Sequence, residues 1–289
     1  MKNAKCLICG SEDFLQRGNI SVHSLMECRG CRLQFLDPVP DNKCLDSIYA
    51  DYYKTWNLDD FQHEVSAMKA ETFRNYLSQI HTDGACGRLL DVGCATGELL
   101  SVAERFGYDI FGIEISPYGI KQCRELFGDN KIQDSYLKKG DFPDDYFDVI
   151  TLSDVFEHIA NPREFLDILC SILKPEGTLM IVTPDTSSWT MGISGRLWPH
   201  YKTEHLFYYN RRNISKLLSG YFHEVNVQLS HKALSVQYVA NVLNGYSNNR
   251  LIKSAAAGIL KYLPKPLRVR TFKINIGEMF VLCSHKLRE

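Results

Sequence analysis

Four cysteines near the start of the chain have the spacing of a metal site. They occur as two CxxC pairs, Cys6 with Cys9 and Cys28 with Cys31. Each pair can place two thiolates on one side of a tight turn, and four thiolates form the tetrahedral set that structural zinc prefers. Four free buried thiols and an iron–sulfur cluster are the alternatives. Because four cysteines saturate a zinc ion, we expect structural Zn²⁺ that stabilises a small module and takes no part in catalysis.

A second group of residues has the pattern of a nucleotide-binding turn. Residues 89–97 read LLDVGCATG, an apolar stretch followed by a turn with two glycines. Gly93 and Gly97 let a backbone approach a ligand closely, and the N–H groups of a following helix favour an electronegative group. Glu114 lies about 20 residues past the turn, where nucleotide-binding folds place an acid that binds ribose hydroxyls. The pattern does not fit the GxGxxG sequence of dinucleotide-binding proteins.

Two histidines are candidates for proton transfer. His158 follows the apolar stretch 147–152, and His205 lies within the segment YKTEHLFYY. Imidazole titrates near neutral pH, so either side chain could accept a proton from a reacting group. A local structural role, such as a hydrogen bond to nearby backbone, is the alternative for each.

The composition excludes several classes of protein. The 289 residues are 45% hydrophobic and 23% charged, with a formal net charge of −1, which excludes a disordered, collagenous or coiled-coil chain. No segment approaches the roughly 18–20 apolar residues of a membrane-spanning helix, and the first residues lack the apolar stretch of a secretory signal. We therefore expect a cytoplasmic protein.

The charge is unevenly distributed. From Gly245 to the end there are nine Lys and Arg but two Asp and Glu. A basic region of this kind is suited to a phosphorylated acceptor or to peripheral contact with an anionic membrane. A solvated basic face beside a packed helix is the alternative.

Apolar stretches alternate with helical stretches from residue 88 onward, which predicts a parallel sheet with helices on both faces. The predicted strands are 89–92, 109–114, 147–152 and 178–182, and the predicted helices are 98–106, 117–127 and 163–173. A helix at 213–218 and strands at 223–229 and 278–284 follow. The long segment between the last two strands, about residues 231–277, contains a helix candidate at 251–263 and is expected to be a functional insertion or lid.

These segments resemble, in order, the motifs of class I S-adenosylmethionine-dependent methyltransferases. LLDVGCATG is similar to the first motif, with Ala95 where glycine is commoner, and LSDVFEHIANP and LKPEGTL at 152–162 and 173–179 are similar to later ones. The resemblance covers residues 88–185. It implies a Rossmann-like α/β fold with a seven-stranded sheet whose last strand is antiparallel. It also implies S-adenosylmethionine as cofactor and S-adenosylhomocysteine as product.

The resemblance also assigns roles to residues. His205 and His158 are the catalytic candidates, and Asp134 with Ser135 would meet the adenine. The implied cofactor-binding residues are Asp91, Gly93, Cys94, Ala95, Gly97, Glu114, Ile115, Asp134, Ser135 and Ser153. The cysteine module resembles the zinc-binding leader of a methyltransferase subgroup that acts on sugars, lipids and small metabolites, and it departs from that pattern at Arg32.

We therefore expect a zinc-binding ribbon or knuckle at 1–40, a helical linker or cap at 41–86, and a methyltransferase domain at 87–289 with a helical insertion before its last strand. The expected activity (EC 2.1.1.-) is methyl transfer to O or C of a small-molecule acceptor: a sugar, a lipid or quinone-like compound, or a natural-product intermediate. Alternatives are an RNA methyltransferase and a non-catalytic binding module. Nucleic acid is disfavoured as a partner because residues 1–38 are nearly neutral.

Overall fold

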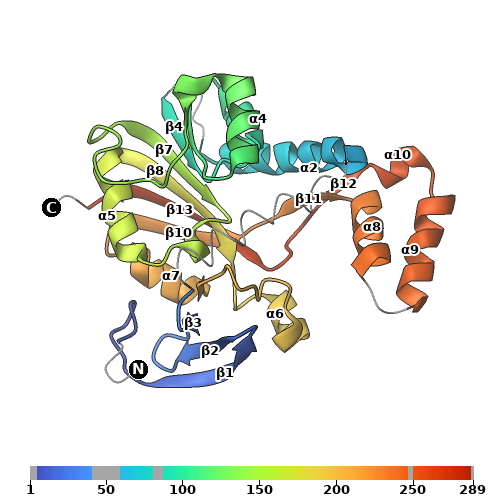
Figure 1. The fold of residues 1–289 in the computed structure, drawn as a ribbon, viewed down its shortest axis with the longest axis horizontal. Coiled ribbons are helices and arrows are strands. Elements are labelled where there is room, and N and C mark those ends of the chain that lie inside the picture. Colours follow the sequence, from blue (N-terminus) through green and yellow to red (C-terminus); the bar gives the residue numbers. More distant parts are fainter. Residues whose placement is uncertain (1–4, 41–58, 81–86, 247–249, 288–289) are drawn as a thin grey trace.

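A seven-stranded mixed sheet forms the centre of the molecule (Figure 1). The computed structural model describes residues 5–40, 59–80, 87–246 and 250–287. Strands β4 to β8 pair in parallel, and β13 is antiparallel to both of its neighbours. In sheet order the strands are β10 (Phe222–Leu229), β13 (Glu278–Lys286), β8 (Leu173–Pro184), β7 (Phe147–Ser153), β4 (Arg88–Val92), β5 (Asp109–Ile113) and β6 (Ile132–Gln133). The predicted sheet, with its antiparallel last strand, is confirmed.

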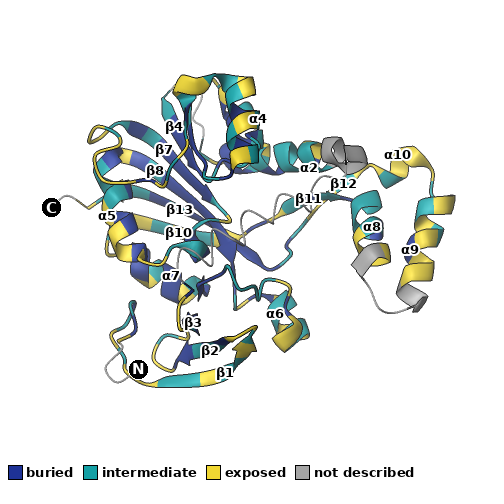
Figure 2. Cartoon of the chain, in the orientation of Figure 1, coloured by how far each residue is buried: buried dark blue, intermediate teal, exposed yellow. Residues whose placement is uncertain are grey.

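The central strands are buried because helices cover both faces of the sheet (Figure 2). Within β7 and β8, the apolar runs VITL and LMIV are almost entirely buried, as expected for parallel strands packed on both sides. One face packs against α5 (Pro162–Ile172) and α7 (Arg211–Leu218). The other packs against α2 (Asp59–Leu77), α3 (Glu98–Arg105) and α4 (Pro117–Phe127).

The sequence pattern predicts most of these boundaries. The helix expected at 117–127 has those bounds, α3 ends one residue earlier than predicted, and α5 begins and ends one residue earlier than predicted. In α5, Phe165, Leu166 and Leu169 recur at helical spacing and are buried against the sheet. Strand β8 begins at residue 173, five residues earlier than expected. The added residues include Lys174, Pro175 and Gly177, whose residue types have low strand propensity.

The N-terminal module forms a second, antiparallel sheet that the main domain completes. Its strands are β1 (Phe14–Ile20), β2 (His23–Cys28) and β3 (Gln34–Asp37), followed by β9 (Phe207–Tyr208) from the region after β8. Gln34 pairs with Tyr208 and Phe35 with Phe207. The cysteine module is therefore joined to the main domain by backbone pairing as well as by side-chain packing.

The segment before the last strand extends from the sheet as an arm (Figure 1). Its base is a two-stranded antiparallel sheet, β11 (Lys232–Ser235) with β12 (Thr271–Ile274), which the sequence pattern did not predict. Between them lie α8 (Val236–Tyr246), α9 (Arg250–Tyr262) and α10 (Lys265–Arg268). The base is tied to α2, since the amide of Ala233 donates to Thr72 Oγ1 (2.9 Å) and Thr271 Oγ1 donates to Glu71 Oε2 (2.7 Å).

Short elements complete the described chain: η1 (Asp129–Lys131), η2 (Phe156–His158), α6 (Trp189–Ser194) and η3 (Gly195–Leu197). Of the expected linker at 41–86, positions 41–58 and 81–86 lie outside the described residues, and α2 represents most of the remainder. Within the described residues, no helix is long and apolar enough to cross a membrane.

Candidate active site

The turn after β4 is shaped by two glycines. At Gly93 φ is +76°, and a Cβ there would lie 2.5 Å from Val155 Cγ2. At Gly97, which precedes α3, φ is +83° and a Cβ would lie 2.7 Å from the Phe127 ring. Residues with a side chain rarely adopt positive φ, and here the added atom would also collide with a neighbour. The turn therefore packs directly against the segment after β7.

Cys94 and Ala95 lie between the two glycines of this turn. Ala95 adopts φ +48°, a left-handed conformation that costs a residue with a Cβ about 1–2 kcal/mol. The thiol of Cys94 is buried, with its Sγ 3.8 Å from that of Cys123. Any contribution of Cys94 to ligand binding would therefore come from its backbone.

Glu114 joins the end of β5 to the glycine turn. Its Oε2 accepts a hydrogen bond from the amide of Ala95 (2.8 Å), and its Oε1 accepts from the amides of Ile115 (2.9 Å) and Ser116 (2.7 Å). A carboxylate offers about four acceptor positions, so these three bonds leave capacity on Oε2 for a ligand hydroxyl. The residues therefore fit a ribose-bearing cofactor, with a fixed carboxylate beside a tight turn.

Asp91 lies beneath the turn, buried near the end of β4. Thr151 donates a hydrogen bond from its hydroxyl to Asp91 Oδ1 (2.7 Å). Burial raises the pKa of Asp91 to about 7; the Thr151 hydrogen bond opposes this shift and the nearby charge of Glu114 adds to it. Asp91 can therefore change its charge near neutral pH.

The other expected cofactor residues follow neighbouring strands. Ile115 follows Glu114, and Ser153 is the last residue of β7; both are partly exposed. Asp134 and Ser135 follow β6, where Asp134 forms an ion pair with Arg124 (2.9 Å) and Ser135 Oγ accepts from Gln133. Since parallel strands end at one edge, the structure brings these residues to the same edge as the turn.

Both candidate histidines meet at that edge, together with a glutamate to which the sequence analysis assigned no role. The rings of His158 and His205 are 4.8 Å apart and perpendicular. One ligand atom each from Glu157, His158 and His205 lies within 4.8 Å of the others. The segments are held by backbone contacts, because Leu206 donates to the Glu157 carbonyl (2.9 Å) and His158 Nδ1 donates to the Glu204 carbonyl (2.8 Å).

Two polar atoms of this cluster are buried and have no hydrogen-bond partner among the described residues: Glu157 Oε1 and His205 Nδ1. The other carboxyl oxygen, Glu157 Oε2, accepts a hydrogen bond from Thr183 (2.9 Å). Burial lowers the pKa of His158 to about 4 and that of His205 well below its usual range, and it raises the pKa of Glu157. Both imidazoles are thus neutral at physiological pH and weak as proton acceptors.

A partly buried cation lies between a buried and an exposed acid nearby. Lys232 Nζ, from the base of the arm, is 2.7 Å from Glu278 Oε1 and 3.3 Å from Asp154 Oδ2. Burial raises the pKa of Glu278 to about 7, with Lys232 opposing the shift, and Glu278 Oε2 has no hydrogen-bond partner in the described part of the chain. This part of the edge therefore combines charges from three distant segments.

The four N-terminal cysteines converge as the spacing predicts. The sulfurs of Cys6 and Cys31 are 3.5 Å apart, as are those of Cys9 and Cys28, and all four lie within 4.8 Å of one another. Four sulfurs bound to one Zn²⁺ at about 2.3 Å would be separated by about 3.8 Å. The geometry fits a tetrahedral thiolate site.

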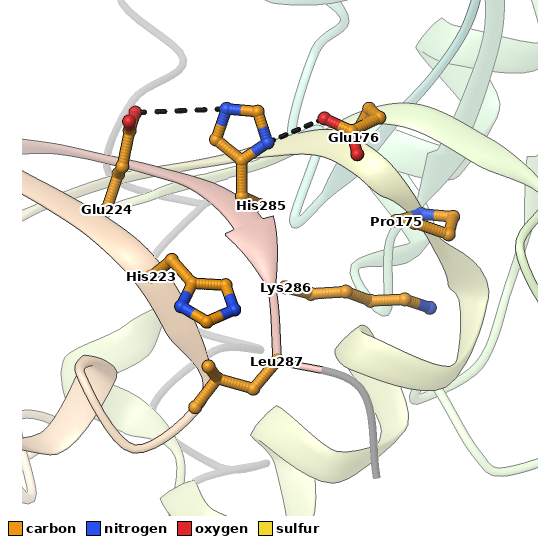
Figure 3. Close-up of a pocket in the computed structure, with 7 residues that line it drawn as sticks. All are labelled: Pro175, Glu176, His223, Glu224, His285, Lys286 and Leu287. Atoms are coloured by element: carbon orange, nitrogen blue, oxygen red, sulfur yellow. Dashed lines mark ion pairs between the residues drawn. The ribbon is translucent and has the colours of Figure 1, made fainter.

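Figure 3 shows a different pocket, at the opposite edge of the sheet. There His285 Nδ1 is 2.5 Å from Glu176 Oε2, and Nε2 is 4.0 Å from Glu224. Because open parallel sheets bind ligands at the carboxyl ends of their strands, we assign no function to it. It is lined by Pro175, Glu176, His223, Glu224, His285, Lys286 and Leu287.

Comparison with known sequences decides the family. The family model described as "Methyltransferase domain" matches residues 30–221, more than half of the chain. The chain belongs to this methyltransferase family. The matched region includes Cys31, the glycine turn, Glu114 and both candidate histidines.

Curated methyltransferases share part of the chain. "Ubiquinone biosynthesis O-methyltransferase" of Xanthomonas campestris pv. campestris is 28% identical over 144 residues, which are 48% of this chain and 59% of that protein. The mitochondrial protein of that name from Homo sapiens is 32% identical over 116 residues, 37% of this chain and 31% of that protein. The chain thus spans less than two thirds of the length of each of these relatives.

Solved methyltransferase structures share the fold. A SAM-dependent methyltransferase from Archaeoglobus fulgidus aligns with a TM-score of 0.51 and 22% identity, covering 76% of this chain and 94% of that one. A SAM-dependent methyltransferase from Thermotoga maritima, described as a possible histamine N-methyltransferase, aligns with a TM-score of 0.52 and 13% identity, covering 84% and 99%. At these identities, the comparison shows that the methyltransferase fold is shared.

Several residues of the candidate site gave no signal in the sequence. Thr183, Lys232 and Glu278 come together only through the fold, and neither a motif nor a fixed spacing connects them. Glu157 directly precedes His158, so the sequence alone could have placed it among the candidate site residues.

Proposed function

We propose that the chain transfers a methyl group from S-adenosylmethionine to O or C of a small-molecule acceptor. The observation that supports this most is Glu114, whose carboxylate is fixed by three amides beside the glycine turn and keeps capacity for a ribose hydroxyl. The family membership supports the same activity. The cofactor, when bound, supplies a sulfonium methyl group with a good leaving group.

The chain's part in this reaction is mainly to bind and orient. The glycine turn and Glu114 would hold the nucleoside, and Asp91, buried below them, would favour a positively charged ligand group when ionised. Asp134 and Ser135, which follow β6, would meet the adenine. Methyl transfer is an in-line displacement, so its rate depends on holding donor and acceptor close and aligned.

The acceptor would lie beyond β7, beside His158 and His205. A hydroxyl acceptor must lose a proton, whereas an acceptor that is already anionic needs no base. The relatives named above are O-methyltransferases of ubiquinone biosynthesis. We therefore propose a phenolic, quinone-like hydroxyl as the first acceptor class to test, ahead of sugars and other natural-product intermediates.

Titration calorimetry with S-adenosylhomocysteine tests the cofactor half of this proposal. We expect binding to the wild-type chain, and at least about tenfold weaker binding for Glu114→Gln, which loses the charged acceptor. Glu125→Gln, an exposed carboxylate on α4, is the matched control and should bind as wild type does. Absence of binding to the wild-type chain would refute the proposal.

Transfer of a labelled methyl group tests the acceptor half. Dihydroxybenzenes with and without an alkyl tail, a nucleotide sugar and an RNA transcript form the panel. We expect turnover with a hydroxylated small molecule. Labelling of RNA alone would favour the RNA methyltransferase, and cofactor binding without turnover on a broad acceptor panel would favour a non-catalytic module.

We further propose that Cys6, Cys9, Cys28 and Cys31 bind one structural Zn²⁺. The sulfur separations support this, and the module otherwise has a small core. Zinc quantification should give one ion per chain, which Cys28→Ser should lose together with stability, whereas Cys170→Ser should retain it. Equal zinc content in both variants would contradict the assignment.

The arm supports a proposal about the partner. Residues 232–277 contain eight Lys and Arg and no Asp or Glu. Around α9, α10 and β12, exposed apolar side chains alternate with exposed basic ones: Ile259, Lys261, Tyr262, Lys265, Leu267, Val269, Arg270, Phe272 and Lys273. In Figure 2, most of the described part of α9 and α10 is coloured as exposed. Apolar residues among cations suit an anionic lipid surface, which is also where a lipophilic acceptor would be found.

Vesicle sedimentation tests this contact. The chain should sediment with phosphatidylcholine vesicles that contain phosphatidylglycerol and much less with phosphatidylcholine alone. Replacing Lys265, Arg270 and Lys273 by Gln should weaken sedimentation, with Lys121→Gln and Lys216→Gln as a control pair. Salt-dependent binding to RNA, with none to the anionic vesicles, would overturn the lipid proposal in favour of a nucleic-acid partner.

A further inference from the structure

The Glu157, His158 and His205 cluster has the composition of a metal site distinct from the four cysteines. Its donors are one carboxylate and two imidazoles, from two segments brought together after β7 and before β9. Such mixed nitrogen and oxygen sets bind first-row divalent transition ions, whereas Mg²⁺ and Ca²⁺ prefer oxygen alone. Glu157 Oε1 and His205 Nδ1 are both buried with no partner within residues 5–40, 59–80, 87–246 and 250–287, and burying polar atoms without partners is costly.

Hydrogen bonds from neighbouring groups fix the orientation of side chains in the cluster, as supporting residues do around bound metal ions. His158 Nδ1 donates to the Glu204 carbonyl, which leaves Nε2 as the ring nitrogen that would bind an ion. Thr183 donates to Glu157 Oε2, which leaves Oε1 as the oxygen directed elsewhere. Imidazoles that ligate metals commonly donate their other ring N–H to a carbonyl, which fixes the tautomer.

We propose that Glu157, His158 and His205 bind one divalent first-row ion, and that the acceptor's hydroxyl oxygen completes its coordination. Ligand atoms on one such ion lie about 3–3.5 Å apart, so modest side-chain rotations close the present separations. The site is next to the cofactor turn, since Val155, two residues before Glu157, contacts the Gly93 position. The role in catalysis rests on the proposed O-methyl transfer; the binding of the ion does not.

The ion would act on the acceptor oxygen before methyl transfer. Coordination lowers the pKa of a bound hydroxyl, whose proton passes to solvent. The oxygen then forms the O–CH₃ bond while the CH₃–S bond breaks, and that electron pair stays on sulfur to give the thioether product. His158 and His205 are then ligands, and the proton acceptor is solvent, in place of the direct base role expected from the sequence.

Mn²⁺ is the probe that separates this site from the cysteines, because thiolates favour softer ions. The zinc-loaded chain is treated with a weak chelator and titrated with Mn²⁺, and free Mn²⁺ is followed by electron paramagnetic resonance. We expect one saturable ion per chain. Glu157→Gln and His205→Ala should each weaken it at least about tenfold, whereas His223→Ala, an exposed histidine on β10, should not.

The outcomes distinguish the proposals. No saturable Mn²⁺, or equal affinity in wild type, Glu157→Gln and His205→Ala, overturns the metal site and indicates a water-filled polar cluster. Thermal denaturation and zinc content show whether each variant folds, and Thr183→Val, which removes only the supporting hydroxyl, provides a milder test with the same expected direction. Binding of S-adenosylhomocysteine to the Mn²⁺-free chain shows that the proposed function survives even where the metal site fails.

Discussion

The two halves of the active-site edge are built by different means. The proposed cofactor half, from the glycine turn to Glu114, is contiguous in sequence and uses backbone amides arranged by tight turns. The proposed acceptor half contains side chains from four distant places: the end of β7, the segment before β9, the start of the arm and the start of β13. The proposed cofactor half thus depends on backbone shape, whereas the proposed acceptor half depends on charged side chains that only the fold brings together.

A large effect is expected from removing the central cation of the proposed acceptor half. Lys232→Met leaves the buried Glu278 without its cation, whereas Asp154 is half exposed and can be solvated, so we expect unfolding free energy to fall by about 2 kcal/mol at pH 8. The loss should be smaller at pH 5.5, where Glu278, with a pKa of about 7, is protonated. Urea denaturation measures both values.

Lys216→Met, an exposed lysine on α7, is the matched control and should change stability little. Affinity for S-adenosylhomocysteine should stay close to wild type in Lys232→Met. A loss of cofactor affinity as large as the loss of stability would mean that the two halves are not separable.

The cofactor half should instead be sensitive to one methyl group. In Gly93→Ala the added Cβ meets Val155 and the backbone is held at φ +76°. We expect about 2–3 kcal/mol of destabilisation and loss of cofactor binding. Gly140→Ala provides the control, because Gly140 has φ +92° with nothing within 4 Å of its added Cβ and suffers only the backbone strain. Equal shifts in melting temperature would show that the collision is unimportant.

A substitution of Asp91 tests the effect of a buried charge in the proposed cofactor half. Its folded pKa of about 7 lies above the ordinary 3.8, so the native state binds this proton more tightly than the unfolded state. Its ionisation therefore lowers the unfolding free energy as pH rises from about 4 to about 7, by an amount on the order of 2–4 kcal/mol. Asp91→Asn should abolish that contribution and be more stable than wild type at pH 8.

Denaturation between pH 4.5 and 8 measures this effect as the difference between the variant and wild type. The exposed Asp144→Asn provides the control and should follow wild type. Parallel curves for Asp91→Asn and wild type would contradict the assignment of the proton to Asp91.

The smallest expected effect comes from the side chain of Ala95 in the glycine turn. Ala95→Gly removes a side chain held at φ +48° and should stabilise the chain by up to about 1 kcal/mol while leaving cofactor binding intact. Ala255→Gly, in the exposed middle of α9, should destabilise by about 1 kcal/mol, as glycine does in a helix. Destabilisation by Ala95→Gly would mean that its methyl group packs usefully.

The same contrast explains how far the sequence could predict the molecule. The glycine turn, the cysteine pairs and the alternating strands and helices are local patterns, and the fold confirms the sheet they predict. The β11–β12 pair and β9 are two to four residues long, too short to show a period, and they pair with strands far away in the chain. The Lys232 contacts and the position of Thr183 likewise depend on packing, which spacing does not reveal.

The pairing of β3 with β9 has a consequence for biosynthesis. Strands β1 to β3 leave the ribosome well before β9, but their sheet needs position 207 to be complete. Until then β3 presents an unpaired edge, which is a hazard for nascent chains. An ion captured early by the cysteines would hold this hairpin in place, so metal supply during translation should influence how much protein reaches the native state.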